Sequence, residues 1–111
     1  MNLMGALRST ELHVLIALAP GALHGYALVK RIEEESDARV KILPGNLYTV
    51  LRRLVAEGLV QESETQPEPD EDQRRRYFEL SDKGRRVLSR EANHLERLVT
   101  KLRSLALKPS E

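Results

Sequence analysis

The chain has 111 residues, of which 41% are apolar and 32% are charged, and this length suits a single domain with a modest core. It contains no cysteine, which excludes disulfides, thiolate metal sites and thiol nucleophiles. Because only three histidines are present, we expect neither a metal site nor another cofactor. Residues 1–9 lack the features of a secretory signal, and no run approaches the roughly 18 apolar residues of a membrane helix. We therefore expect a cytoplasmic protein with no membrane partner.

The net charge of +1 is distributed unevenly along the chain. Residues 1–58 contain seven Lys and Arg residues and six acidic residues. Residues 59–80 contain three basic and seven acidic residues, and residues 81–111 contain eight basic and four acidic residues. This pattern is not that of a general polyanion binder. Any contact with nucleic acid must therefore come from a local basic patch.

Three helices are predicted in the first half of the chain. The first is expected to begin at residues 9–10, whose hydroxyls suit a helix cap, with Glu11 beside its positive N-terminal end. Its predicted buried residues, at helical spacing, are Leu12, Leu15, Ile16 and Ala19. After a short turn, the second helix should span about residues 25–36. The third begins at Pro44, because proline suits a first helical turn, and stops at Gly58.

The second half of the chain predicts a hairpin and a long helix. Residues 59–64 and 75–80 are expected to form two strands, and the tip between them holds two prolines and four acids. Ser81 then caps the last helix, in which apolar residues recur at spacings of four and three. This period predicts a seam along which the helix packs on a partner helix. The seam residues are Leu88, Ala92, Leu95, Val99, Leu102 and Ala106, and the residues that widen the apolar face are Leu98 and Leu105.

This order of elements is typical of a winged helix-turn-helix, a mainly α fold with a small β-hairpin. We expect residues 1–80 to form a DNA-binding domain with its wing tip at about 65–74. Residues 81–111 are expected to form a C-terminal dimerisation helix and a short tail. In this fold the third helix lies in a major groove of double-stranded DNA and the hairpin flanks it.

The exposed face of the third helix carries side chains that suit a DNA groove. Asn46 and Thr49 can hydrogen-bond base edges, and Tyr48 can contact a phosphate or a sugar. Arg52 and Arg53 are long donors on the same helix. On helical periodicity alone, these residues fit an ordinary solvated helix face equally well.

A second basic cluster favours DNA binding. Arg74, Arg75 and Arg76 follow the acidic tip where the hairpin returns. In the alternative interpretation, these arginines only neutralise the neighbouring acids of the tip. Because a strand alternates its faces, the three side chains cannot all point the same way.

Five segments occur in a characteristic order, and each by itself is a weak signal. They are Leu-His-Gly-Tyr (23–26), Pro-Gly-Asn-Leu-Tyr (44–48), Leu-Arg-Arg-Leu (51–54), Glu-Gly-Leu-Val (57–60) and Arg-Arg-Arg-Tyr-Phe-Glu-Leu-Ser (74–81). In this order and spacing, the chain resembles short members of the PadR family of bacterial transcriptional regulators. The resemblance covers nearly everything from residue 9 to residue 106.

The resemblance implies a winged helix-turn-helix that forms a homodimer through its C-terminal helix and binds an inverted-repeat operator. Most members are repressors, and some respond to small effector molecules. The DNA-facing residues that it implies are Tyr26, Asn46, Tyr48 and Thr49. Arg75 and Arg76 match the basic pair of the family's wing.

The chain departs from the family pattern at two places. Leu43 precedes Pro44, where the family often has a serine or threonine that caps the recognition helix, and loss of such a cap costs about 1 kcal/mol. The wing tip, residues 66–73, is acidic where the family often has glycines. We expect this tip to resist entering a minor groove, so that the wing contacts DNA through the arginines at its base.

Three alternatives remain open at this stage. The seam of the last helix could pack on the protein's own first helix instead of a partner. A small hydrophobic effector could bind beside Leu95, Leu98 and Val99, although this helix lacks the aromatic residues that some relatives use. The module could also bind a protein partner without any sequence-specific contact to DNA.

An enzymatic function is not supported by the sequence. It contains no recognisable nucleophile motif and no phosphate-binding glycine loop, and most of its carboxylates lie on predicted solvent faces. We therefore assign no catalytic residues. His24 is expected to order the turn before the second helix rather than to act as an acid or a base.

Overall fold

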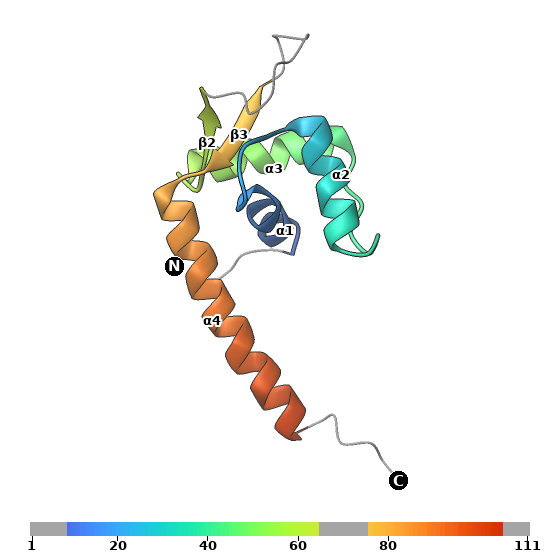
Figure 1. Cartoon of the computed structure of the whole chain (residues 1–111), viewed down its shortest axis with the longest axis vertical. Helices are drawn as coiled ribbons and strands as arrows, with labels where there is room; N and C mark the ends of the chain where they lie inside the picture. The colour runs from blue at the N-terminus through green and yellow to red at the C-terminus, as the bar shows by residue number, and fades with distance from the viewer. Residues whose placement is uncertain (1–8, 65–75, 106–111) are drawn as a thin grey trace.

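The computed structural model describes residues 9–64 and 76–105. Its elements are α1 (Ser9–Leu18), β1 (Leu23–His24), α2 (Gly25–Glu35), α3 (Pro44–Ala56), β2 (Val60–Ser63), β3 (Tyr77–Leu80) and α4 (Asp82–Leu105). Helices α1 to α3 and the sheet form a head, and α4 extends away from it (Figure 1). The order of helices and hairpin strands is the predicted one. The wing tip at 65–74 lies outside the described residues.

The sheet contains one strand more than the sequence predicts. Its three antiparallel strands are ordered β1-β3-β2, and in β1 Leu23 pairs with Phe78 and His24 with Tyr77. The expectation of a simple turn before α2 was therefore wrong. A strand of two residues is too short to show the alternation that marks strands in a sequence, and only its pairing with β3 defines it.

Helix α1 is the centre of the core, because it contacts α2, α3, α4 and β3. The prediction of its buried face was partly wrong. Leu15 is fully buried, but Ile16 is exposed, whereas Val14 and Leu18 are fully buried. A helix with neighbours on several sides buries more of its circumference than the single stripe of a surface helix.

The ends of α2 are stabilised by local hydrogen bonds. His24 is the N-cap residue, and its Nδ1 accepts a 3.2 Å hydrogen bond from the Ala27 amide, which confirms the structural role predicted for this histidine. After α2, Asp37 and Ala38 adopt left-handed conformations with φ of 53° and 63°. The Ser36 hydroxyl accepts a 3.0 Å hydrogen bond from the Val40 amide and orders the connection to α3.

Helix α3 has the bounds and the incomplete cap that the sequence predicts. Its N-cap residue is Leu43, which makes no side-chain capping hydrogen bond, and Pro44 occupies the first turn. Gly58 follows the helix with φ of 78°, a conformation that glycine adopts without strain. The buried face of α3 consists of Leu47, Leu51 and Leu54.

The first turn of α4 is hydrogen-bonded to the C-terminal ends of α1 and α3. As predicted, Ser81 caps the helix, and its Oγ accepts a 3.0 Å hydrogen bond from the Gly84 amide. Lys83 Nζ donates to the carbonyl of Glu57 at 2.9 Å. Arg85 Nη1 donates to the carbonyl of Ala19 at 3.3 Å. These bonds fix the direction in which α4 leaves the head.

Gly84→Ala tests how closely α4 must approach β2. An added Cβ would overlap the backbone carbonyl of Leu59 and lie 3.3 Å from the Leu80 side chain. We expect a loss of about 2–3 kcal/mol in the free energy of unfolding, measured by urea denaturation, because overpacking at a backbone contact forces the helix to shift. Gly21→Ala is the control, since nothing lies within 4 Å of its added Cβ. Equal stabilities of the two variants would contradict this account.

Candidate nucleic-acid interface

The outer face of α3 carries the predicted groove-facing residues. Asn46, Tyr48, Thr49 and Arg52 are all exposed on the side opposite the buried leucines. The Thr49 hydroxyl donates a 3.2 Å hydrogen bond to the carbonyl of Gly45, so its oxygen is left as an acceptor for a partner. The structure thus leaves four of the predicted residues exposed on α3, with Asn46 and Tyr48 on either side of Thr49 and Arg52.

Tyr48 also contacts the beginning of α2. An ideal Cβ at Gly25 would lie 2.6 Å from the Tyr48 hydroxyl oxygen, so the tyrosine occupies the space that this glycine leaves free. Tyr26 follows in the first turn of α2 and is strongly exposed. Both tyrosines assigned to DNA by the family resemblance therefore lie on the surface, and one of them extends from α3 to α2.

Arg53 has a partner that the sequence analysis missed. Its Nη1 lies 3.4 Å from Oε2 of Glu11, which is only 6% exposed. Glu11 therefore has a neighbour on α3 in addition to its favourable position near the start of α1. The signal was present in the spacing, because Glu11 precedes the buried Leu15 and Leu18 by four and seven residues and shares their helix face. The DNA contact of Arg53 stays a prediction.

Arg76, at the foot of the wing, is paired with a carboxylate across the hairpin. Its Nε and Nη2 donate to the two carboxylate oxygens of Glu62, each at 3.0 Å. Its guanidinium carbon lies 5.5 Å from the centroid of the Phe78 ring. This carboxylate lies in β2. Arg74 and Arg75 lie outside the described residues.

Strand β2, which carries Glu62, contacts α3. The hydrogen bond to Glu62 is the largest cause that raises the pKa of Arg76 above its ordinary value, followed by the charge of Glu62 and, after opposing desolvation, by Tyr48. The two parts of the predicted interface, the α3 face and the wing, are neighbours in space.

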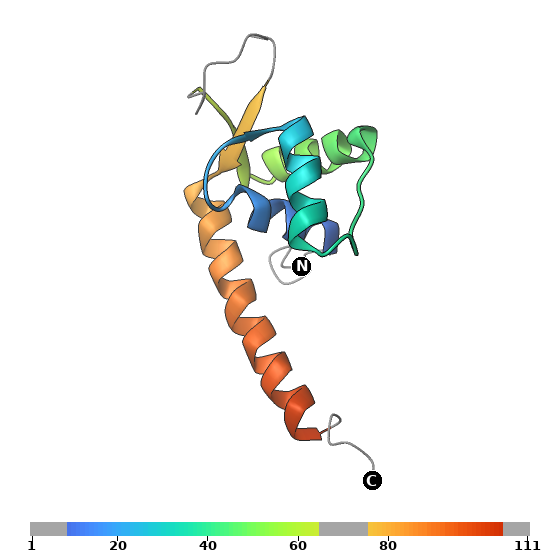
Figure 2. The same cartoon turned by 45° about the vertical axis from the view of Figure 1, so that its right-hand side comes forward.

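The apolar seam of α4 is exposed beyond its first turns. Leu88 is partly buried against the core, and Ala92 is exposed. The large side chains farther along the seam are 38–71% exposed, and they are Leu95, Leu98, Val99, Leu102 and Leu105. Figure 2 shows this part of α4 projecting beyond the head. Packing on the protein's own first helix therefore explains only the start of the seam. Ala106 lies outside the described residues.

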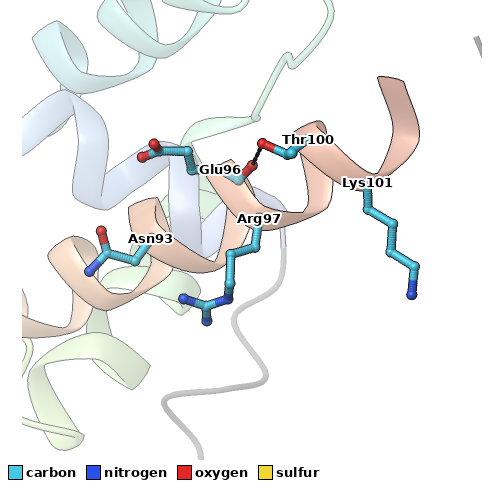
Figure 3. Close-up of a pocket in the computed structure, with 5 residues that line it drawn as sticks. All are labelled: Asn93, Glu96, Arg97, Thr100 and Lys101. Carbon is cyan, nitrogen blue, oxygen red and sulfur yellow. Dashed lines mark hydrogen bonds between the residues drawn. The ribbon is translucent and has the colours of Figure 1, made fainter. Parts of the chain in front are cut away.

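The hollow beside α4 is lined by polar and charged residues. It has a volume of about 420 Å³ and is lined by Asn93, Glu96, Arg97, Thr100 and Lys101. In Figure 3, the Thr100 hydroxyl donates a hydrogen bond to the carbonyl of Glu96, at 3.0 Å. None of the three residues expected to line an effector site is among them, so a small hydrophobic effector stays a prediction.

Residues 9–64 and 76–105 contain neither a candidate metal site nor a candidate membrane span. No group of three or more His, Cys, Asp or Glu residues there could hold a metal ion. No helix in this part of the chain is long and apolar enough to cross a membrane.

Two solved structures with the same arrangement are described as transcriptional regulators. A PadR-like transcriptional regulator from Bacillus cereus superposes with a TM-score of 0.71 at 20% identity, over 90% of this chain and 93% of that one. A transcriptional regulator from Clostridium thermocellum gives a TM-score of 0.69 at 23% identity, over 88% and 92% of the two chains. These likenesses establish the fold as that of PadR-like winged-helix proteins.

A sequence relative is known from a mobile element. It is described as an uncharacterized 37.1 kDa protein in transposon TN4556 of Streptomyces fradiae, and it is 44% identical over 88 residues. The match covers 79% of this chain but only 23% of that protein.

The fold defines the chain as a winged helix-turn-helix protein. The Transcriptional regulator PadR-like family matches residues 14–90, well over half of the chain, and the protein belongs to this family. Its members are DNA-binding transcriptional regulators and not enzymes.

The hydrogen bond with Arg76 predicts how Glu62 titrates. This bond is the largest cause that lowers the pKa of Glu62 below the ordinary value of 4.5. Because the folded-state pKa is depressed, the pair stabilises the fold above the ordinary glutamate pKa, and this contribution is lost as the pH falls through the lowered value. In an NMR titration of the Glu62 carboxyl carbon, Arg76→Gln should move the midpoint upward. An unchanged midpoint would show that the pair does not form in solution.

Proposed function

We propose that the protein is a homodimeric, cytoplasmic transcriptional repressor that binds an inverted-repeat operator through α3 and the wing. The observation that carries this proposal is the outer face of α3, where Asn46, Tyr48, Thr49 and Arg52 are exposed together next to the foot of the wing. Amide and hydroxyl groups suit base edges, and arginine suits guanine or phosphate. Tyr26, Arg53, Arg74, Arg75 and Arg76 complete the proposed DNA contacts.

The α4 seam supports the homodimer. A row of exposed apolar side chains on a helix that projects from its own domain is stabilised when a partner removes it from water. A second copy of the same helix offers a matching seam, and a twofold axis makes the interface self-complementary. Two α3 helices would then meet two half-sites about 10 base pairs apart, one turn of DNA.

Selection of the purified protein on random duplex DNA tests the proposal. We expect enrichment of an inverted repeat, with log affinity falling against log salt by about 0.9 for each phosphate neutralised. Tyr48→Ala should weaken binding to the selected operator by about tenfold or more without changing the circular dichroism spectrum, whereas Tyr48→Phe isolates the contribution of the hydroxyl. A folded protein that enriches no sequence would favour the alternative of a protein-interaction module.

Two charged substitutions in the seam test the dimer. Leu95→Glu with Leu102→Glu should give monomers at micromolar concentration in sedimentation velocity, because burial of unpaired carboxylates opposes association. Asn93→Glu with Thr100→Glu is the matched control, since it places the same charges at the same spacing in the hollow beside α4. A dimer that survives the Leu95 and Leu102 substitutions would rule out the seam as the interface.

A further inference from the structure

Arg76 holds the carboxylate of Glu62 in the geometry in which an arginine binds an anion. Two parallel N–H···O bonds of 3.0 Å join the arginine fork to both carboxylate oxygens. A phosphate group presents two oxygens to an arginine in the same bidentate way. The carboxylate of Glu62 therefore occupies the place that a DNA phosphate would take on this arginine.

The hairpin register holds the two side chains together. Glu62 pairs with Phe78, and Arg76 precedes Phe78 by two residues, so all three side chains share one face of the sheet. The guanidinium also lies over the Phe78 ring, a contact that does not depend on the carboxylate. Arg76 can therefore keep its position while its anionic partner is exchanged.

Both members of the pair are accessible to an incoming ligand. The side chains of Arg76 and Glu62 are 61% and 51% exposed. Exchange of one anion for another at this surface requires no change in the core. Strand β2, which carries Glu62, contacts α3, so this site lies beside the proposed recognition helix.

We propose that Arg76 forms a phosphate site at the foot of the wing, and that Glu62 occupies this site in the DNA-free protein as an internal competitor of DNA. The inference rests on the proposed DNA-binding function and adds a residue that limits its affinity. Glu62 must release Arg76 before the arginine can bind a phosphate, and its freed carboxylate then repels the DNA backbone. Both effects weaken binding to any duplex, because phosphate contacts carry no sequence information.

Four variants measured by fluorescence anisotropy test this competition. Glu62→Gln should tighten binding about fivefold, the upper range for a well-formed exposed ion pair, and should steepen the salt dependence by about one phosphate. Arg76→Gln should weaken binding. In the double variant, the gain from Glu62→Gln should fall below twofold, because the competition for Arg76 is gone and only the repulsion between the carboxylate and DNA is relieved.

Glu79→Gln is the matched control. Glu79 lies on β3 of the same hairpin and accepts a 2.7 Å hydrogen bond from Gln61 Nε2, so this substitution removes an equal charge without touching Arg76. We expect less than a twofold change in affinity. Circular dichroism and thermal unfolding should show that all variants remain folded.

The choice of DNA separates this inference from the proposed function. Every variant is measured on a selected operator and on an unrelated duplex of equal length, because a phosphate site acts on both. Glu62→Gln binding no tighter than the wild type, or keeping its gain in the Arg76→Gln background, would overturn the inference. Equal wild-type affinity for the two duplexes would instead overturn the sequence-specific function. The change in affinity caused by Glu62→Gln on either duplex would still decide whether Glu62 competes with DNA for Arg76. Failure to bind either duplex would overturn both.

Discussion

The close approach of α4 to the beginning of β2 is the constraint on which the functional geometry depends. Gly84 lies against the Leu59 carbonyl, and Lys83 and Arg85 bond to the carbonyl ends of α3 and α1. Cations at the C-terminal ends of helices are favourable because of the exposed carbonyl dipoles. The long helix therefore has a fixed direction relative to the recognition helix. In the proposed dimer, the contacts of the first turn of α4 with the head set the distance between the two α3 helices.

Carboxylates from the same chain meet two of the arginines predicted to contact DNA. Glu11 is buried and lies beside Arg53, so this pair links the central helix to α3. Glu62 is exposed and holds Arg76 at the foot of the wing. These two pairs differ in consequence, because a buried carboxylate needs its partner for stability, whereas an exposed one can be exchanged. In the proposed DNA complex, this internal neutralisation would lower the general attraction to phosphate and leave more of the discrimination to the proposed base contacts on α3.

Much of the fold was predictable because its signals are local. Pro44 and Gly58 mark the bounds of α3, and Ser81 marks the start of α4, through backbone preferences that act within a few residues. The outer face of α3 was predictable for the same reason, since the spacing of its leucines leaves the opposite side to solvent. Three features depended on distant partners instead. These were strand β1, the burial on more than one side of α1, and the carboxylate partner of each arginine.

The sequence by itself determined the order of the four helices and the two hairpin strands, the family, and the exposed face of α3 that is proposed to contact DNA. Periodicity, capping and turn residues carry that information over short distances along the chain. Only the tertiary structure decided that Arg53 meets Glu11 and that Arg76 meets Glu62, because pairing across 42 and 14 residues requires the packed core and the hairpin register. It also decided that the α4 seam is uncovered, since an apolar stripe has the same spacing whether it faces its own domain or a partner.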